Sequence, residues 1–112
     1  MLRILRNYVE AHRVVLILQG YIVAEWAGVL ERECRELSRS GFRVSLDLTR
    51  VVFVGRPGIE ALGRLGQAGV GIMGCPPLLA EMLENEGIEV GRTVVDVSDG
   101  KAPWKPGGGA DA

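Results

Sequence analysis

The sequence is short of the residues from which catalytic and metal sites are usually built. Its 112 residues include one histidine, two cysteines and 5% aromatic residues. A lone histidine argues against a metal site or a catalytic triad, so we expect His12 to be a surface turn residue, with a general base as the alternative. Two cysteines make no disulfide framework, and we expect Cys34 and Cys75 to be free, buried and unreactive. We therefore predict a protein that is not an enzyme and holds neither a metal nor a cofactor.

The sequence also lacks an excess of charge of either sign. Its 13 Lys and Arg residues balance 14 Asp and Glu residues, for a formal net charge of −1. This balance offers no electrostatic attraction to nucleic acid or to an anionic membrane. No apolar run approaches the ~20 residues of a membrane span, and none at the N-terminus has signal-peptide length. We expect a cytoplasmic protein that neither binds nucleic acid nor inserts into a membrane.

Hydrophobic residues make up 47% of the sequence. Along the chain, segments in which they follow the strand period alternate with segments in which they follow the helix period. Period-two alternation and short β-branched runs predict five strands, at about residues 2–9, 14–18, 43–48, 70–73 and 93–97. Apolar residues at steps of three and four predict three helices, which begin at about Val23, Pro57 and Pro76. Gly41 and Gly87 are expected to end the first and third of these helices.

The order of these elements, strand-strand-helix-strand-helix-strand-helix-strand, predicts the fold class. Such alternation is typical of α/β proteins with right-handed crossovers. We expect a single, mostly parallel or mixed sheet of about five strands with three helices, its first strand antiparallel to the second. Residues 1–98 would form this domain, and residues 99–112 a Gly/Pro-rich tail that carries Trp104.

Several finer expectations concern individual positions. The continuous apolar run at residues 14–18 predicts a strand that is covered on both faces. Trp26 falls on the apolar stripe of the first helix, which predicts core packing. Thr49-Arg50 is expected to break the third strand after Leu48. The inner face of the third helix is expected to comprise Leu78, Leu79, Met82 and Leu83.

Residues 69–74 fit the pattern G-x-G-x-x-G, and Glu89 follows Gly69 by 20 positions. The dinucleotide-binding motif requires a strand before the first glycine and a helix that opens within the motif. Here the match overlaps a predicted strand and comes after a helix. The pattern therefore does not favour a nucleotide site.

Residues 47–62, DLTRVVFVGRPGIEAL, resemble the central motif of STAS domains, the anti-sigma factor antagonists and the related modules of sulphate transporters. In that family a strand ends in Asp-Leu-Ser, an apolar stretch follows, and Asp-Ser-Ser-Gly-Leu opens a helix. Residues 74–87 resemble the family's third helix, and residues 19–22 stand where Gly-Glu-Leu-Asp is frequent. The resemblance covers about residues 2–97 and implies the STAS fold and a protein partner.

The resemblance also implies a switch, because a partner kinase phosphorylates a serine or threonine at the start of the family's second helix. In this sequence the phosphoacceptor position is Pro57, the preceding serine is Arg56, the acidic residue is Gly55, and only Gly58 is kept. None of the replacements can accept phosphate. Either Gly55 and Pro57 simply shape the turn with Arg56 solvated, or these four residues still bind a partner without a phosphorylation switch.

The favoured hypothesis is a non-enzymatic protein-interaction module of bacterial signal transduction, similar to an anti-sigma factor antagonist that regulates transcription. Its partner would be an anti-sigma factor, a kinase-like protein or a subunit of a transport complex. The alternative is a module of a transport complex that binds a small anion, a nucleotide or a lipid. A third hypothesis is a scaffold that works by homo-oligomerisation, since the fourth helix that often closes the family's fold is missing here.

Overall fold

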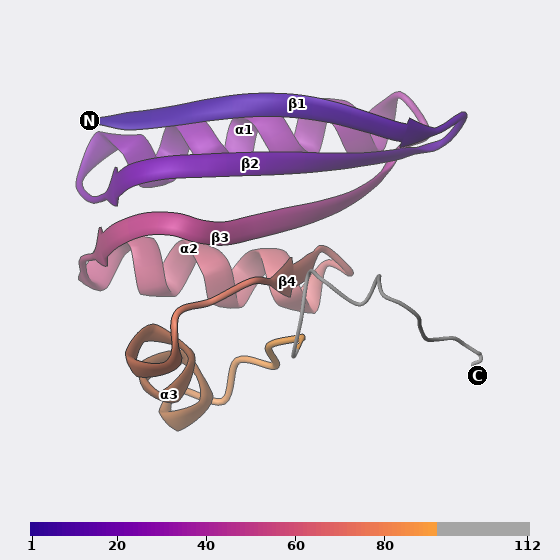
Figure 1. The fold of residues 1–112 in the computed structure, drawn as a ribbon. Helices are drawn as coiled ribbons and strands as arrows, with labels where there is room; N and C mark the ends of the chain where they lie inside the picture. Colours follow the sequence, from indigo (N-terminus) through magenta and orange to yellow (C-terminus); the bar gives the residue numbers. More distant parts are fainter. Residues whose placement is uncertain (92–112) are drawn as a thin grey trace.

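The computed structural model describes residues 1–91, which form an α/β fold with three helices and one four-stranded sheet (Figure 1). In chain order the elements are β1 (Leu2–Glu10), β2 (Arg13–Ile22), α1 (Glu25–Arg39), β3 (Arg43–Val54), α2 (Arg56–Gln67), β4 (Gly71–Met73) and α3 (Pro77–Asn85). The strand order in the sheet is β1-β2-β3-β4. β1 is antiparallel to β2, and the other pairs are parallel, so the expected mixed sheet and its antiparallel first strand are confirmed.

The expected number of about five strands is corrected to four for the described part of the chain. The predicted strand at residues 93–97, the predicted tail at 99–112 and Trp104 all lie outside the described residues. Within residues 1–91 no helix is long and apolar enough to cross a membrane.

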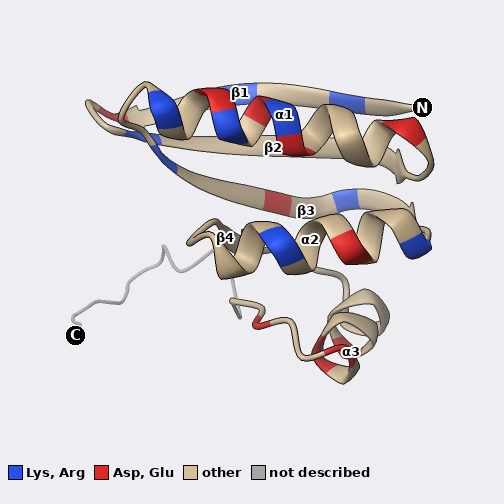
Figure 2. Ribbon diagram, turned by 180° about the vertical axis from the view of Figure 1, so that it is seen from behind, with Lys and Arg blue, Asp and Glu red and all other residues tan. Residues whose placement is uncertain are grey.

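The core lies between one face of the sheet and the helices α1 and α2, which both cover that face (Figure 2). The side chains that are fully shielded from solvent come from both layers. They include Leu16, Leu18, Leu30, Leu46 and Leu62. Along β2, buried residues alternate with half-buried ones, so the prediction of a strand covered on both faces is wrong. The helices cover one face only, because both crossovers pass on the same side of the sheet.

Helix α1 buries the stripe formed by Ala27, Leu30, Cys34 and Leu37, whose spacing follows the helical period. Trp26 is partly buried and packs against the core, in line with its position on the apolar side. The opposite side of α1 carries charges of both signs (Figure 2). One of its glutamates, Glu31, accepts two hydrogen bonds from Arg64 of α2 at 2.8 and 2.9 Å, which joins the two helices across the surface.

Helix α3 lies beyond β4, at the lower edge of the sheet in Figure 1. Leu79 and Leu83 are buried, whereas Leu78 is 73% exposed and Met82 is 38% exposed. The expected inner face of four residues is therefore too wide. A helix that packs along one edge of the sheet needs only a single row of apolar residues four positions apart, and this leaves the flanking pair in solvent.

Candidate functional site

The second half of β3 departs from the alternation of a regular strand. Leu48, Val51 and Val54 are buried at every third position, and the pairs 49–50 and 52–53 between them are exposed. The register against β2 shifts at two places, where one extra residue of β3 is accommodated each time. Such irregularities are β-bulges, which re-aim side chains and are frequent beside functional sites. The expected strand end at Leu48 is therefore wrong, because β3 continues through a bulge at Leu48 and Thr49, and Arg50 pairs again with Gln19 of β2.

Asp47 stabilises the first bulge. One of its carboxylate oxygens accepts a hydrogen bond from the Thr49 backbone N–H at 2.9 Å and another from the Thr49 hydroxyl at 2.6 Å. When a short acidic side chain accepts a hydrogen bond from the backbone N–H two residues further on, that N–H needs no partner on the neighbouring strand. The bulge is thus held by the sequence Asp-x-Thr itself.

The second bulge places two apolar residues of β3 in solvent directly before helix α2. Phe53 is 52% exposed and lies in register with Tyr21 of β2, which is 46% exposed. Val52 is also exposed. The Phe53 ring reaches over the following turn, since its Cε2 atom would be only 3.7 Å from a Cβ atom placed on Gly55. The result is an exposed apolar group at the carboxyl ends of β2 and β3.

The turn from β3 into α2 begins at Gly55, which caps the helix, and continues through Arg56 and Pro57 in its first turn. The Gly55 N–H donates to the Ile22 carbonyl at 3.0 Å, and the Gly55 carbonyl accepts from the Ile59 N–H at 2.9 Å. Gly55 has an ordinary φ of −81°, so its dihedral angles do not require glycine. Gly55 is half-buried, and Arg56 and Pro57 are exposed.

Gly58 differs from the three preceding residues of the turn because it is buried. A Cβ atom on Gly58 would be 2.3 Å from the Ile22 carbonyl oxygen and 2.8 Å from a methyl carbon of Val54. The missing side chain lets the first turn of α2 pack directly on the end of β2. Of the four candidate residues, Gly58 is therefore a packing residue, and only Gly55, Arg56 and Pro57 reach the surface.

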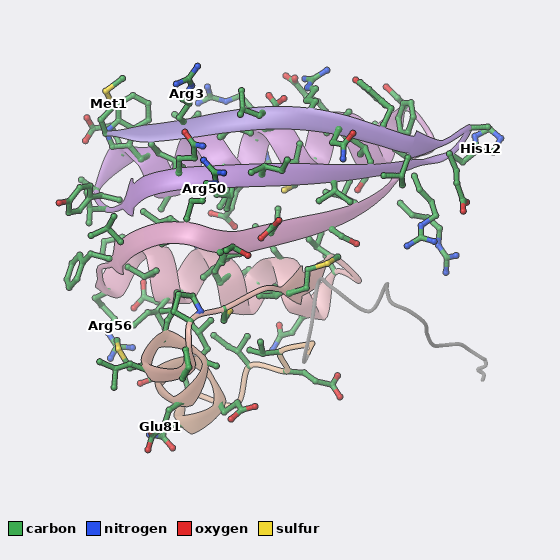
Figure 3. The ribbon with its side chains drawn as sticks, in the orientation of Figure 1. Met1, Arg3, His12, Arg50, Arg56 and Glu81 are labelled. Atoms are coloured by element: carbon green, nitrogen blue, oxygen red, sulfur yellow. The ribbon has the colours of Figure 1, made fainter. Side chains whose placement is uncertain are left out.

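The Arg56 side chain is exposed, but it is paired with a carboxylate of this same chain. Its two terminal nitrogens donate to the two carboxylate oxygens of Glu86, the residue that caps the C-terminus of α3, at 3.2 and 3.3 Å. This pairing holds the Arg56 pKa above its ordinary value. Arg56 lies beside α3 at the end of the molecule opposite His12 (Figure 3). Sequence inspection missed Glu86, because a partner 30 residues away leaves no local signal.

The distances indicate that this ion pair is loose. The contacts between Arg64 and Glu31 are 2.8 and 2.9 Å, within the usual range for charge-assisted hydrogen bonds, whereas those between Arg56 and Glu86 are longer. The two arginines are equally exposed, at 60% for Arg56 and 59% for Arg64, but Glu86 is 40% exposed and Glu31 only 15%, so the Arg56 pair is also the more solvated. The Arg56 guanidinium is thus the more readily available of the two.

The loop before α1 carries backbone strain next to this turn. Ala24 has φ 50° and ψ −131°, and it is the one non-glycine residue of the described chain with positive φ. Its neighbour Val23 borders Gly55, since a Cβ on Gly55 would be 3.2 Å from a Val23 methyl carbon. A strained non-glycine residue costs about 1–2 kcal/mol and is most often found at functional sites.

The other candidate residues do not assemble a reactive site. His12 lies in the exposed turn between β1 and β2 (Figure 3). Burial raises the pKa of Cys34 to about 12 and that of the half-buried Cys75 to about 11, so both thiols stay protonated near neutral pH. Within residues 1–91 no group of three or more potential ligands gathers where a metal ion could bind.

A groove of about 830 Å³ brings Glu89 together with most of the glycine pattern at residues 69–74. The pattern nevertheless has the wrong architecture for a phosphate. Strand β4 lies inside it instead of before it, and the next helix begins only at Pro77. A dinucleotide site needs a helix N-terminus within the glycine turn, and this groove has none.

The comparisons with known proteins define the class of fold. No protein-family model matches the chain, and no curated protein matches its sequence. Among solved structures, an anti-sigma factor antagonist from Mycobacterium paratuberculosis is similar with a TM-score of 0.69 at 18% identity, over 85% of this chain and 87% of that one. The chain therefore has the fold of anti-sigma factor antagonists, the STAS fold, as the sequence resemblance implied.

More particularly, the fold is that of SpoIIAA. The unphosphorylated form of this anti-sigma factor antagonist is similar with a TM-score of 0.68 at 15% identity, over 82% of this chain and 89% of that one. The phosphorylated Bacillus form is similar with a TM-score of 0.62 at 15% identity, over 82% of this chain and 92% of that one.

Proposed function

We propose that this chain is a non-enzymatic protein-interaction module that binds its partner through the turn surface, defined here as Tyr21, Val52, Phe53, Gly55, Arg56 and Pro57. The observation that carries the proposal is that two exposed aromatic residues, Tyr21 and Phe53, lie in register on neighbouring strands at the start of α2. An exposed cluster of large apolar residues with a polar rim is typical of an interaction site.

Three further features support this assignment. Aromatic residues and arginine contribute most of the binding energy in protein interfaces, and the turn surface contains both. Phe53 is brought to the surface by a bulge of β3, and the neighbouring residue Ala24 is strained. Bulges and strain both concentrate at functional sites.

The binding we propose is not switched by phosphorylation of the turn. Gly55, Arg56 and Pro57 have no hydroxyl group, so the turn itself stays permanently in a state that resembles the unphosphorylated one. We accordingly place the chain in cytoplasmic bacterial signalling, with an anti-sigma factor or a kinase-like protein as its partner. Binding of a small anion is the alternative, and it would require Arg56 to leave Glu86, its present counter-ion.

The test compares turn variants with matched controls. Phe53→Ser and Arg56→Glu alter the turn surface. Val9→Ser removes an apolar residue of similar exposure on β1, and Arg64→Glu reverses an equally exposed arginine that is also paired with a glutamate. A partner recovered with the wild-type protein from its native cells is identified, purified, and titrated calorimetrically against all five proteins.

The expected result is a loss of at least about tenfold in affinity for each turn variant, the effect of removing an interface anchor. The two controls are expected to bind as the wild type does, and circular dichroism is expected to give the same spectrum for all five proteins. Equal affinity of Phe53→Ser and the wild type for the purified partner would refute the assignment of the turn surface.

A further inference from the structure

Two rows of side chains cross the face of the sheet that α1 and α2 leave uncovered, which we call the open face. One row contains Tyr21 and Phe53 of the turn surface. In the adjoining row Arg3 of β1 is opposite Gln19 of β2, and Gln19 is opposite Arg50 of β3. Figure 3 shows both arginines on the half of the sheet next to Met1, at the end opposite His12. The turn surface therefore continues into a basic row.

The alternation of β2 assigns this row to the open face. Leu18 is fully shielded in the core beneath the helices, so Gln19, the next residue of the strand, points the other way. Residues directly opposite each other on paired strands share a face of the sheet. Arg3 and Arg50, which both pair with Gln19, therefore project from the open face, and both are exposed.

Neither arginine of the basic row is in an ion pair within residues 1–91. The ion pairs of this part of the chain use four other arginines, namely Arg6, Arg13, Arg56 and Arg64. The carboxylate nearest in register is that of Asp47, which is opposite Ile17 one row further away and accepts two hydrogen bonds from Thr49. Two such cations beside exposed aromatic residues are complementary to an anionic ligand.

The opposite flank of the turn surface has the opposite charge. Arg56 joins the turn to α3 through Glu86, and residues 74–91, which include α3, contain no Lys or Arg but four glutamates, Glu81, Glu84, Glu86 and Glu89. Glu81 projects from α3 into solvent (Figure 3). An acidic segment bound at the turn surface is therefore repelled by α3 and attracted to the basic row. This division of charge fixes the direction in which such a segment would run.

We propose that the partner presents an acidic segment, which extends from the turn surface across the open face and places its carboxylates beside Arg3 and Arg50. The inference rests on the proposed function and adds the chemistry of the partner to it. A carboxylate accepts two parallel hydrogen bonds from one arginine, so a few acidic residues satisfy this row. A nucleic acid fits less well, because two arginines neutralise only about two phosphates.

The test titrates the purified partner calorimetrically against Arg3→Glu, Arg50→Glu and Phe53→Ser, at low and at high salt. Arg32→Glu is the matched control, since Arg32 is equally an exposed arginine without an ion pair in residues 1–91, but lies on α1 behind the sheet. We expect each open-face variant to lose at least about fivefold in affinity at low salt, and to depend less on salt than the wild type. The control is expected to bind as the wild type does.

The outcomes separate this inference from the proposed function. Weak binding of Phe53→Ser together with wild-type affinity of both open-face variants would overturn the acidic segment and leave the turn surface standing. Wild-type affinity of Phe53→Ser would refute the turn surface and the inference with it. Self-association of the wild-type protein that Arg50→Glu abolishes would also overturn the inference, because it would assign the basic row to the acidic α3 of a second copy.

A second measurement uses probes of defined charge and the wild-type protein alone. The isotopically labelled protein is titrated in the NMR spectrometer with a synthetic peptide of alternating leucine and glutamate, and separately with one of alternating leucine and lysine. We expect the amide signals of Gln19, Tyr21 and Arg50 to shift with the acidic peptide only. An equal response to both peptides, or a stronger response to a single-stranded RNA or to anionic vesicles, would overturn the proposal.

Discussion

Gly58→Ala should destabilise the protein although alanine is the better helix former. The substitution adds one carbon within the first turn of α2, and the added Cβ would be 2.3 Å from the Ile22 carbonyl oxygen, 2.8 Å from a Val54 methyl and 2.9 Å from an Ile22 methyl. The nearest of these atoms belongs to the backbone. It cannot retreat without disturbing the hydrogen bond that Ile22 accepts from Gly55.

The magnitude follows from two opposing effects. Overpacking against backbone costs about 3 kcal/mol, the upper part of the usual range. Replacing a helical glycine with alanine returns about 1 kcal/mol, so the net loss in the free energy of unfolding is about 2 kcal/mol. Gly63→Ala in the same helix is the matched control. Its nearest neighbour, Ile88, is 3.7 Å away, so only the favourable effect of about 1 kcal/mol is expected.

Urea unfolding followed by circular dichroism measures both effects. With a slope near 1 kcal/mol per M, the midpoint of Gly58→Ala should fall by about 2 M, and that of Gly63→Ala should rise by about 1 M. A Gly58→Ala midpoint within about 0.5 M of the wild type would refute the close approach of α2 to β2. It would also return Gly58 to the set of surface residues that could bind a partner.

Three more predictions test other parts of the structure. Ala24→Gly should raise the free energy of unfolding by about 1 kcal/mol, because glycine adopts the positive φ without strain and caps the helix better than alanine; a lower thermal midpoint would contradict the strain. Leu83→Ala should lose about 2–5 kcal/mol and Leu78→Ala less than about 0.5 kcal/mol in urea unfolding, and equal losses would contradict the orientation of α3. The Cys34 pKa is about 12 in the folded protein against 9.0 for an ordinary thiol. The unfolded chain therefore releases its proton first, so the contribution of Cys34 to the free energy of unfolding should be constant below pH 9 and fall between pH 9 and 12. Cys34→Ala should flatten this fall, and an unchanged slope would count against burial of the thiol.

Much of the fold could be predicted from the sequence, because the apolar residues of most segments follow either the strand period or the helix period. Helix α1 illustrates this, since its buried stripe from Ala27 to Leu37 is legible as steps of three and four. The antiparallel first strand was also predictable, because the break at Ala11-His12 is too short for a crossover.

The parts that could not be predicted depend on contacts between distant segments. A bulge is not visible in a pattern that assumes alternation, so the polar pair Thr49-Arg50 resembled the end of a strand. The exposure of Leu78 depends on how far α3 lies from the sheet, which no local pattern records. The pairing of Arg56 with Glu86 requires α2 and α3 to meet, and the sequence resemblance located Arg56 without its partner.

The two bulges of β3 have a consequence for how this chain can diverge. In a regular strand each buried residue is followed by one exposed residue, but between Leu48 and Val54 each buried residue is followed by two exposed residues. Folding therefore leaves positions 50, 52 and 53 able to accept new side chains with little effect on the core, whereas Thr49 is tied to Asp47 in the first bulge. A lineage could in this way exchange one binding specificity for another by substitutions in a single strand, while the domain keeps its stability throughout.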